Sequence, residues 1–324
     1  MLSSNVSALI LAPMEGVTDA PMRALQGEAG AFTYAVSEFL RVHHSVPQKN
    51  IFYRHVPELR NSGLTASGLP VQVQILGGNA ERMAGAAVIA CEAGAKAIDI
   101  NFGCPARTVN RHDGGATLLQ YPKRIREIVR AVRDAVPSAI PVSAKLRLGW
   151  DSVKPIFENA QMAAEGGASW LTIHARTRSA GYAPPVHWAF IGKVRERLGI
   201  PVVANGDIWT IDDFRRCRDE TGCRHFMLGR GALADPRLAH RVAVELGIAA
   251  EMPNGALANV DWASQLRRLV EWTHRLAEPR PDRAIYRLKQ WLNYAATFGE
   301  FTGFDAIKRA KNIDDLFLCL ANAA

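Results

Sequence analysis

Short runs of apolar and β-branched residues recur along the first two thirds of the chain, separated by longer segments with a different spacing of apolar positions. Each run is five to seven residues long, which is the usual length of a β-strand. The runs predict strands at residues 8–12, 34–39, 71–76, 97–101, 142–148, 170–174, 201–206 and 225–229.

The segments between these runs place apolar residues three and four positions apart, a spacing typical of amphipathic helices. Residues 81–95 and 122–136 show it most clearly. Eight strands, each followed by a helix over about 240 residues, predict an α/β fold of the (β/α)8 TIM-barrel type. The alternative is a doubly wound open sheet, but the G-x-G-x-x-G turn that usually marks it does not occur in the sequence.

The pattern changes after about residue 250. Residues 251–260, EMPNGALANV, are rich in turn-forming residues, and from Asp261 onward the sequence predicts helices without strands. We therefore expect a TIM-barrel catalytic domain over residues 1–250 and a small all-helical domain over residues 251–324.

Composition narrows the class of protein. Apolar residues make up 48% and charged residues 22% of the 324 residues, which is typical of a folded domain with a sizeable core. No run of about 18 uncharged apolar residues occurs and the N-terminus lacks a basic leader, so we expect a cytoplasmic protein without a membrane span. Five cysteines without C-x-x-C spacing favour a reduced compartment and no structural metal.

The charge balance indicates possible partners. The formal net charge is +8 and the isoelectric point is about 9.4. A surplus of this size suits a polyanionic partner, because each neutralised phosphate releases counterions. An ordinary basic enzyme would carry the same surplus, so charge alone leaves both interpretations open.

Polar residues follow the predicted strands at their carboxyl ends, and a barrel gathers all these ends on one rim. They are Glu15, Glu38, Gln74, Asn101, Lys145, Arg147, His174, Arg176, Asn205, Asp207 and Arg230. We expect these side chains to converge on a single pocket. A cysteine, Cys104, stands on the loop directly after Asn101, between Gly103 and Pro105.

Two glycine-containing turns favour a phosphate site. Residues 205–208 (NGDI) and 229–233 (GRGAL) follow the seventh and eighth strands, where many barrels bind phosphate through backbone N–H groups. Arg230 and Lys145 would add positive charge, and Gln74 could hydrogen-bond the edge of a heterocycle. These groups suit FMN better than a sugar phosphate, although Lys145 as a Schiff-base lysine leaves an aldolase as an alternative.

Motifs along the whole barrel resemble those of the tRNA-dihydrouridine synthases. In order along residues 8–235 they are LAPMEGVTD, SEF, VQVQILG, DINFGCPARTVNRHDGGATLL, KLRLGWD, IHARTRSAGY, VVANGDI and MLGRGAL. The segments SEFLRV and LKQWLNY are most similar to the bacterial DusC subfamily, and this similarity implies uridine 16 of the tRNA D-loop as the target.

The resemblance implies reduction of the uracil 5,6 double bond, with hydride passing from reduced FMN to C6 and a proton from Cys104 to C5. A thiol with a pKa near 8.5 is protonated at neutral pH yet gives up its proton far more readily than a hydroxyl. FMN would be tightly bound and NADPH would reduce it transiently. The residues that match flavin-contacting positions of the family are Pro13, Met14, Glu15, Gln74, Lys145, His174, Asn205, Gly206, Asp207, Gly229 and Arg230.

The helix predicted at residues 281–296 suggests how tRNA is held. At 100° per residue, Ile285, Leu288, Leu292, Ala295 and Ala296 share an apolar face, and Arg283, Arg287, Gln290, Trp291 and Tyr294, with Tyr286 alongside, share the other. Cations with aromatic rings suit looped RNA. A solvated basic face with its rings packed on other helices is the alternative. By resemblance, Arg41, Asn101, Arg147, Arg287, Lys289, Tyr294 and Lys308 match substrate-binding positions.

Three functions remain open from the residues alone. The first is a flavin-dependent tRNA reductase, which we expect to be a monomer because its RNA substrate is large. The second is a flavin barrel that acts on a free pyrimidine, and the third is an RNA-binding barrel without catalysis. The basic and aromatic helix favours an RNA substrate over a free pyrimidine.

Overall fold

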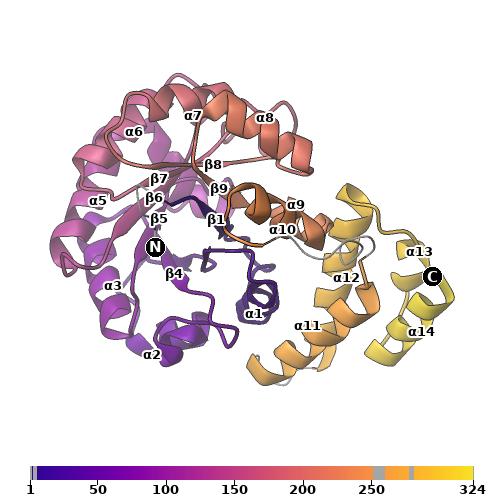
Figure 1. The fold of residues 1–324 in the computed structure, drawn as a ribbon. Helices are drawn as coiled ribbons and strands as arrows, with labels where there is room; N and C mark the ends of the chain where they lie inside the picture. The colour runs from indigo at the N-terminus through magenta and orange to yellow at the C-terminus, as the bar shows by residue number, and fades with distance from the viewer. Residues whose placement is uncertain (1, 3–5, 251–259, 277–280, 324) are drawn as a thin grey trace.

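The computed structural model describes residues 2, 6–250, 260–276 and 281–323, and the chain up to residue 250 forms a closed barrel of parallel strands surrounded by helices (Figure 1). The barrel strands are β1 (Ala8–Leu11), β2 (Tyr34–Val36), β4 (Val71–Leu76), β5 (Ile98–Asn101), β6 (Val142–Arg147), β7 (Leu171–His174), β8 (Val202–Asn205) and β9 (His225–Leu228). Strands β4 to β9 pair in chain order, β9 pairs with β1, β1 with β2, and β2 with β4, which closes the cylinder. The predicted (β/α)8 barrel is confirmed.

The second predicted strand is divided in two. The sequence predicts a strand over residues 34–39, but β2 ends at Val36 and a two-residue strand, β3 (Leu40–Arg41), pairs further along β4. The reason lies at Ser37, whose side-chain Oγ accepts the backbone N–H of Gln74 at 3.0 Å. A hydroxyl therefore takes the place of a backbone carbonyl at this point, and the regular ladder is interrupted.

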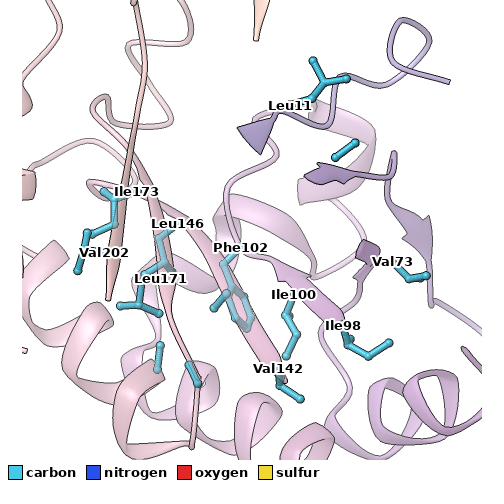
Figure 2. Close-up of a cluster of buried hydrophobic side chains, with 14 of the residues drawn as sticks. Leu11, Val73, Ile98, Ile100, Phe102, Val142, Leu146, Leu171, Ile173 and Val202 are labelled. Atoms are coloured by element: carbon cyan, nitrogen blue, oxygen red, sulfur yellow. The ribbon is translucent and has the colours of Figure 1, made fainter. Parts of the chain in front are cut away.

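Alternate residues of the central strands face opposite sides of the barrel wall, as the pleat of a strand requires. The apolar set packs against the surrounding helices in one continuous core, and Figure 2 shows part of it, including Val73, Ile98, Ile100, Val142 and Leu146. The intervening residues are polar and point into the barrel: Gln72, Gln74, Asp99, Asn101, Ser143, Lys145 and Arg147. A polar interior along β4, β5 and β6 needs internal partners, because buried polar groups are costly when unpaired.

Helices cover the outside of the barrel. They are α1 (Ala20–Glu28), α2 (Lys49–His55), α3 (Ala80–Glu92), α4 (Arg107–Asn110), α5 (Pro122–Ala135), α6 (Ile156–Glu165), α7 (Trp188–Arg195), α8 (Ile211–Thr221), α9 (Arg230–Ala234) and α10 (Pro236–Glu245), with 3-10 turns at Pro57–Asn61 and Gly115–Gln120. The helix expected at 122–136 is α5. The helix expected at 81–95 is α3, which ends earlier because Gly94 takes a left-handed φ of 109°.

The described residues after 260 are mainly helical, as predicted, and pack against one side of the barrel (Figure 1). Its helices are α11 (Trp262–Leu276), α12 (Pro281–Phe298), α13 (Phe304–Ile307) and α14 (Ile313–Ala323). They share a second hydrophobic cluster in which Leu266, Leu288 and Leu292 pack with Met22 of α1 and Leu233 of α9. The expected domain boundary at residue 251 lies outside the described residues.

Polar contacts also join the helices to the barrel. The Trp272 indole donates to Glu28 at the end of α1 at 2.7 Å. The Trp291 indole donates to the backbone carbonyl of Leu233 at 2.9 Å, and its side chain is buried. Helical periodicity places Trp291 on the basic and aromatic face but at its margin, which left burial in the core open, and the structure buries it. Residue 291 lies at the margin of the two faces, where the docking of α12 on α9 decides its environment.

In the described part of the chain, no helix has both the length and the apolar character that crossing a membrane requires.

Candidate active site

A cavity of about 560 Å³ opens at the carboxyl ends of the barrel strands, which is the size range of small-molecule and cofactor sites. Its wall combines strand ends, βα loops and the end of α12. It is lined by Ala12, Pro13, Met14, Glu15, Val17, Phe39, Asn101, Gly103, Cys104, Pro105, Ala106, Lys145, Arg147, His174, Tyr182, Asn205, Gly206, Asp207, Ile208, Trp209, Met227, Leu228, Gly229, Arg230, Gly231, Tyr294 and Phe298. Eight of the eleven polar strand-end residues predicted to converge line this cavity, and the exceptions are Glu38, Gln74 and Arg176.

The register of the strands places polar residues of neighbouring strands side by side in the cavity wall. Arg147 of β6 pairs with His174 of β7, His174 with Asn205 of β8, and Asn205 with Met227 of β9. One layer lower, Asn101 of β5 pairs with Lys145. Residues far apart in the sequence thus stand side by side because parallel strands of a barrel are staggered in a fixed register.

The turn that carries Cys104 is held by hydrogen bonds on both sides. The Asn101 side-chain oxygen accepts the backbone N–H groups of Gly103 and Cys104, each at 2.9 Å. The Arg147 guanidinium donates to the carbonyl of Gly103 at 2.9 Å, and the backbone N–H of Ala116 donates to the carbonyl of Cys104 at 3.1 Å. These bonds fix the thiol in the cavity wall.

The thiol of Cys104 is half-buried, and its environment favours the protonated form. Burial raises the pKa of Cys104 above its ordinary value, and the Glu15 carboxylate acts in the same direction. The cations of Arg41 and Arg147 oppose this rise without cancelling it. Cys104 therefore carries its proton at neutral pH and could donate it to a group in the cavity.

A network of buried hydrogen bonds inside the barrel holds the side chain of Asn101 in place. Asn101 donates to the Gln74 carbonyl oxygen at 2.9 Å, and Gln74 donates to the Asp99 carboxylate at 2.6 Å. Ser143 donates to the other Asp99 oxygen. Both polar atoms of Gln74 are engaged in this chain, its side chain is buried, and the structure does not bring it to the cavity wall.

Positive charge dominates the cavity floor. Lys145 donates to the Asn205 side-chain oxygen at 3.0 Å, and burial, reinforced by the Arg147 cation, lowers the pKa of Lys145 to about 8. Burial and four surrounding cations lower the pKa of His174 well below its ordinary value, so its ring is neutral at neutral pH. The four cations are Arg147, Lys145, Arg176 and Arg230.

One carboxylate is shared by two arginines. Asp207 accepts from Arg176 on both oxygens, at 2.7 Å on Oδ1 and at a shorter distance on Oδ2, and Arg176 is fully buried. Arg230 reaches the same Asp207 at 3.4 Å. Because Asp207 can neutralise only one of them, a positive charge remains next to the cavity, and an anionic group would stabilise it.

Two features of the wall fit a bound cofactor. The Nε2 atom of His174 is buried and has no hydrogen-bond partner among the described residues. Gly206 has a φ of 120°, and a Cβ there would lie 3.5 Å from that Nε2 and 3.3 Å from the backbone nitrogen of Ala175. Glycine keeps the space in front of His174 open, so that a ligand can use the free nitrogen.

Aromatic side chains complete the rim, and most of them are absent from the residues predicted for the site. They are Phe39, Tyr182, Trp209 and Phe298, together with the expected Tyr294. Phe39 ends the SEF motif, Tyr182 ends the IHARTRSAGY motif and Trp209 directly follows the NGDI turn, so proximity to a motif was an available signal for these three. Phe298 lies on α12, and no local pattern links it to the barrel.

The sequence profile of the family described as dihydrouridine synthase (Dus) matches residues 10–310. The chain is 45% identical over 287 residues to the tRNA-dihydrouridine(16) synthase of Shewanella oneidensis, with 88% of each chain covered. It is 42% identical over 318 residues to the tRNA-dihydrouridine(16) synthase of Haemophilus influenzae, with 96% of this chain and 98% of that chain covered. This chain belongs to the dihydrouridine synthase family.

A solved structure supports the fold of this dihydrouridine synthase. Histamine dehydrogenase from Rhizobium sp. 4-9 superposes with a TM-score of 0.56 over 74% of this chain and 46% of that chain, at 16% identity. At this identity the likeness concerns the barrel fold alone. Family membership itself confirms the resemblance drawn from the sequence motifs, and it weighs against the aldolase alternative built on Lys145.

The structure brings most predicted site residues of this dihydrouridine synthase to one cavity. Those that line it are Pro13, Met14, Glu15, Asn101, Cys104, Lys145, Arg147, His174, Asn205, Gly206, Asp207, Gly229, Arg230 and Tyr294. Those that lie outside the cavity wall are Gln74, Arg41, Arg287, Lys289 and Lys308.

The outlying cations already have partners within the chain. Arg287 forms an ion pair with Asp19, the N-cap of α1, and Lys289 donates to the backbone carbonyls of residues 308 and 310. Arg41 and Lys308 are more exposed, and they face Glu15 at 3.5 Å and Asp305, respectively.

No group of three or more His, Cys, Asp or Glu side chains within residues 2, 6–250, 260–276 and 281–323 is arranged to hold a metal ion.

Proposed function

We propose that this protein reduces the 5,6 double bond of a uridine in tRNA to give dihydrouridine, with FMN as its tightly bound cofactor and NADPH as the reductant. The observation that carries the proposal is the half-buried Cys104 thiol in the wall of a cavity rich in cations, in a member of the dihydrouridine synthase family. The relatives named tRNA-dihydrouridine(16) synthase favour uridine 16 as the target.

The residues of the cavity fit FMN. The charge left over at Arg230 suits a phosphate, and the unpartnered His174 nitrogen and the Lys145 ammonium can both bond an acceptor. Met14, Met227 and Ile208 supply apolar wall for a planar ring. A reduced flavin, when bound, supplies the hydride that saturates C6 of the uracil.

Cys104 supplies the matching proton. Saturation of the double bond requires one proton at C5, and a general acid delivers it best when it holds that proton at the working pH. The raised pKa of Cys104 meets this requirement. Asn101 and Arg147 hold the turn from opposite sides, so the thiol keeps its position while the substrate base enters.

The C-terminal helices, residues 251–324 in the predicted division, are proposed to hold the tRNA. Arg41 and Lys308 are the exposed members of the predicted substrate set, and Tyr294 reaches the cavity from α12. Arg287 and Lys289 would have to exchange an internal partner to reach a phosphate. Arg41 and Lys308 can therefore exchange their partners for RNA phosphates at a lower free-energy cost than Arg287 and Lys289, since exposed ion pairs contribute little stability.

We also propose that the protein works as a monomer in the cytoplasm, where tRNA is modified. All five cysteines are free, as expected for a reduced compartment.

The proposal is tested with purified protein and unmodified tRNA transcript. Oxidised-flavin absorbance should accompany the protein, and incubation with NADPH should produce dihydrouridine at position 16. Reduction of free uridine or UMP at the same rate as tRNA would instead favour a small-molecule enzyme. A colourless protein that forms no dihydrouridine after addition of FMN would contradict the proposal.

A further inference from the structure

The guanidinium of Arg230 is enclosed by three aromatic rings. Its Cζ atom lies 4.5 Å from the ring centroid of Tyr182, 4.9 Å from that of Trp209 and 5.3 Å from that of Phe298. Trp209 and Phe298 also stack on each other, with centroids 4.6 Å apart and planes 21° from parallel. We call these three rings the Arg230 cage.

The rings hold the cation without using its hydrogen-bond donors. A guanidinium has five N–H donors, and aromatic faces attract its charge but offer no strong acceptor. Among the described residues, Arg230 makes one side-chain hydrogen bond, a 3.4 Å contact with Asp207. This single contact leaves most N–H donors of Arg230 available to a ligand. Asp207 is in addition already engaged by Arg176 on both of its oxygens.

The members of the cage come from distant parts of the chain. Tyr182 stands on the loop before α7, Trp209 on the turn before α8, and Phe298 is the last residue of α12. Tyr294, one helical turn earlier on α12, stacks on Phe298 at 6.2 Å. The end of α12 thus reaches the cavity wall near Arg230, the first residue of α9, and Figure 1 shows α12 on the side of the barrel where α9 and α10 lie.

From this geometry we infer that Phe298 and Trp209 are positioning residues that orient the Arg230 guanidinium toward the phosphate of the cofactor, so that the C-terminal helices are part of the FMN site. The inference rests on the proposed function. Without the ring of Phe298, one side of the guanidinium opens to solvent, and the long Arg230 side chain gains rotamers that point away from the cavity. Fewer molecules then present the donors in the binding geometry, and phosphate affinity falls.

The test compares two flavins on the full-length flavin-free protein. Phe298→Ala should weaken FMN binding roughly three- to thirty-fold, the range expected when one cation–π interaction is removed. Binding of riboflavin, which lacks the phosphate, should stay unchanged. Phe298→Trp should restore FMN affinity, because a larger ring can cover the same side of the guanidinium.

A double-mutant cycle shows whether the effect passes through Arg230. In an Arg230→Met background, Phe298→Ala should cause no further loss of FMN affinity. Tyr121→Ala is the matched control, because Tyr121 is 49% exposed and packs on Arg124 at 5.8 Å away from the cavity lining. It should leave the affinities for both flavins unchanged.

Two results would overturn the inference while leaving the proposed function intact. One is wild-type FMN affinity in Phe298→Ala, and the other is an equal loss for FMN and riboflavin, which would mean that Phe298 acts on the ring system or on the fold. Wild-type protein that binds neither flavin would refute the proposed function and this inference with it.

Discussion

Gly115 lies so close to Cys104 that no side chain fits between them. A Cβ at position 115 would stand 2.9 Å from the Cys104 carbonyl oxygen and 3.1 Å from its Cβ, and Gly115 has a φ of 59°. The loop that follows the thiol therefore touches the thiol's own backbone, and the position of Cys104 depends on the absence of a side chain at residue 115.

Gly115→Ala should displace Cys104 and lower the rate of dihydrouridine formation by about ten-fold or more, because small misplacements of a catalytic group are costly. Flavin content should not change. Gly30→Ala is the control, since Gly30 has a similar φ of 63° but open space around its Cα. If both variants lose activity equally, backbone strain and not contact with Cys104 is the cause.

Cys104→Ala should retain flavin and lose about 100-fold or more in rate, the usual contribution of a general acid. The wild-type rate should be steady through neutral pH and fall as the pH rises through the pKa of Cys104, because the protonated form is the active one and burial raises this pKa above its ordinary value. Single-turnover rates measured across neutral and alkaline pH check this. Cys91→Ala, on α3 and absent from the cavity lining, should behave as wild type, and an alkaline fall that persists in Cys104→Ala would contradict the assignment.

FMN affinity should fall by roughly ten-fold as the pH rises through about 8. Below that pH Lys145 is charged and can make a charge-assisted hydrogen bond to the cofactor; above it the buried amine is neutral and this contribution is lost. Titration of flavin-free protein on both sides of that pH measures the effect. Lys145→Met should bind FMN weakly across this range with no inflection near pH 8, whereas an unchanged inflection would assign it to another group.

Salt dependence separates the cations that bind tRNA from those that hold the fold. Arg41→Gln combined with Lys308→Gln should lower the slope of log K against log salt by about two, one for each phosphate that is no longer neutralised. Arg287→Gln should instead lower the melting temperature, because it leaves the Asp19 carboxylate without its ion-pair partner. Filter-binding titrations and thermal melts of the same variants distinguish the outcomes. If Arg287→Gln reduced the slope of log K against log salt and left the melting temperature unchanged, Arg287 would be assigned to the tRNA-binding surface.

Local patterns in the sequence were sufficient to predict the barrel. The alternation of residues such as Ile98, Asp99 and Ile100 is a property of one strand, and strands of this kind recur along the chain with helices between them. The carboxyl end of a strand is equally local, so Cys104, Lys145 and His174 could be assigned to one rim before any contact between them was known. Each of these inferences needs only residues that are near neighbours in the chain.

Contacts between distant segments could be read only from the tertiary structure. Gln74 lies at a strand end like the others, yet its hydrogen bonds to Asp99 and Asn101 keep it below the cavity wall. The docking of α12 on α9 buries Trp291 and brings Phe298 to Arg230. Amphipathic spacing shows which face of a helix is apolar, but packing against another element decides what lies at the edge of that face and which side chains complete a neighbouring site.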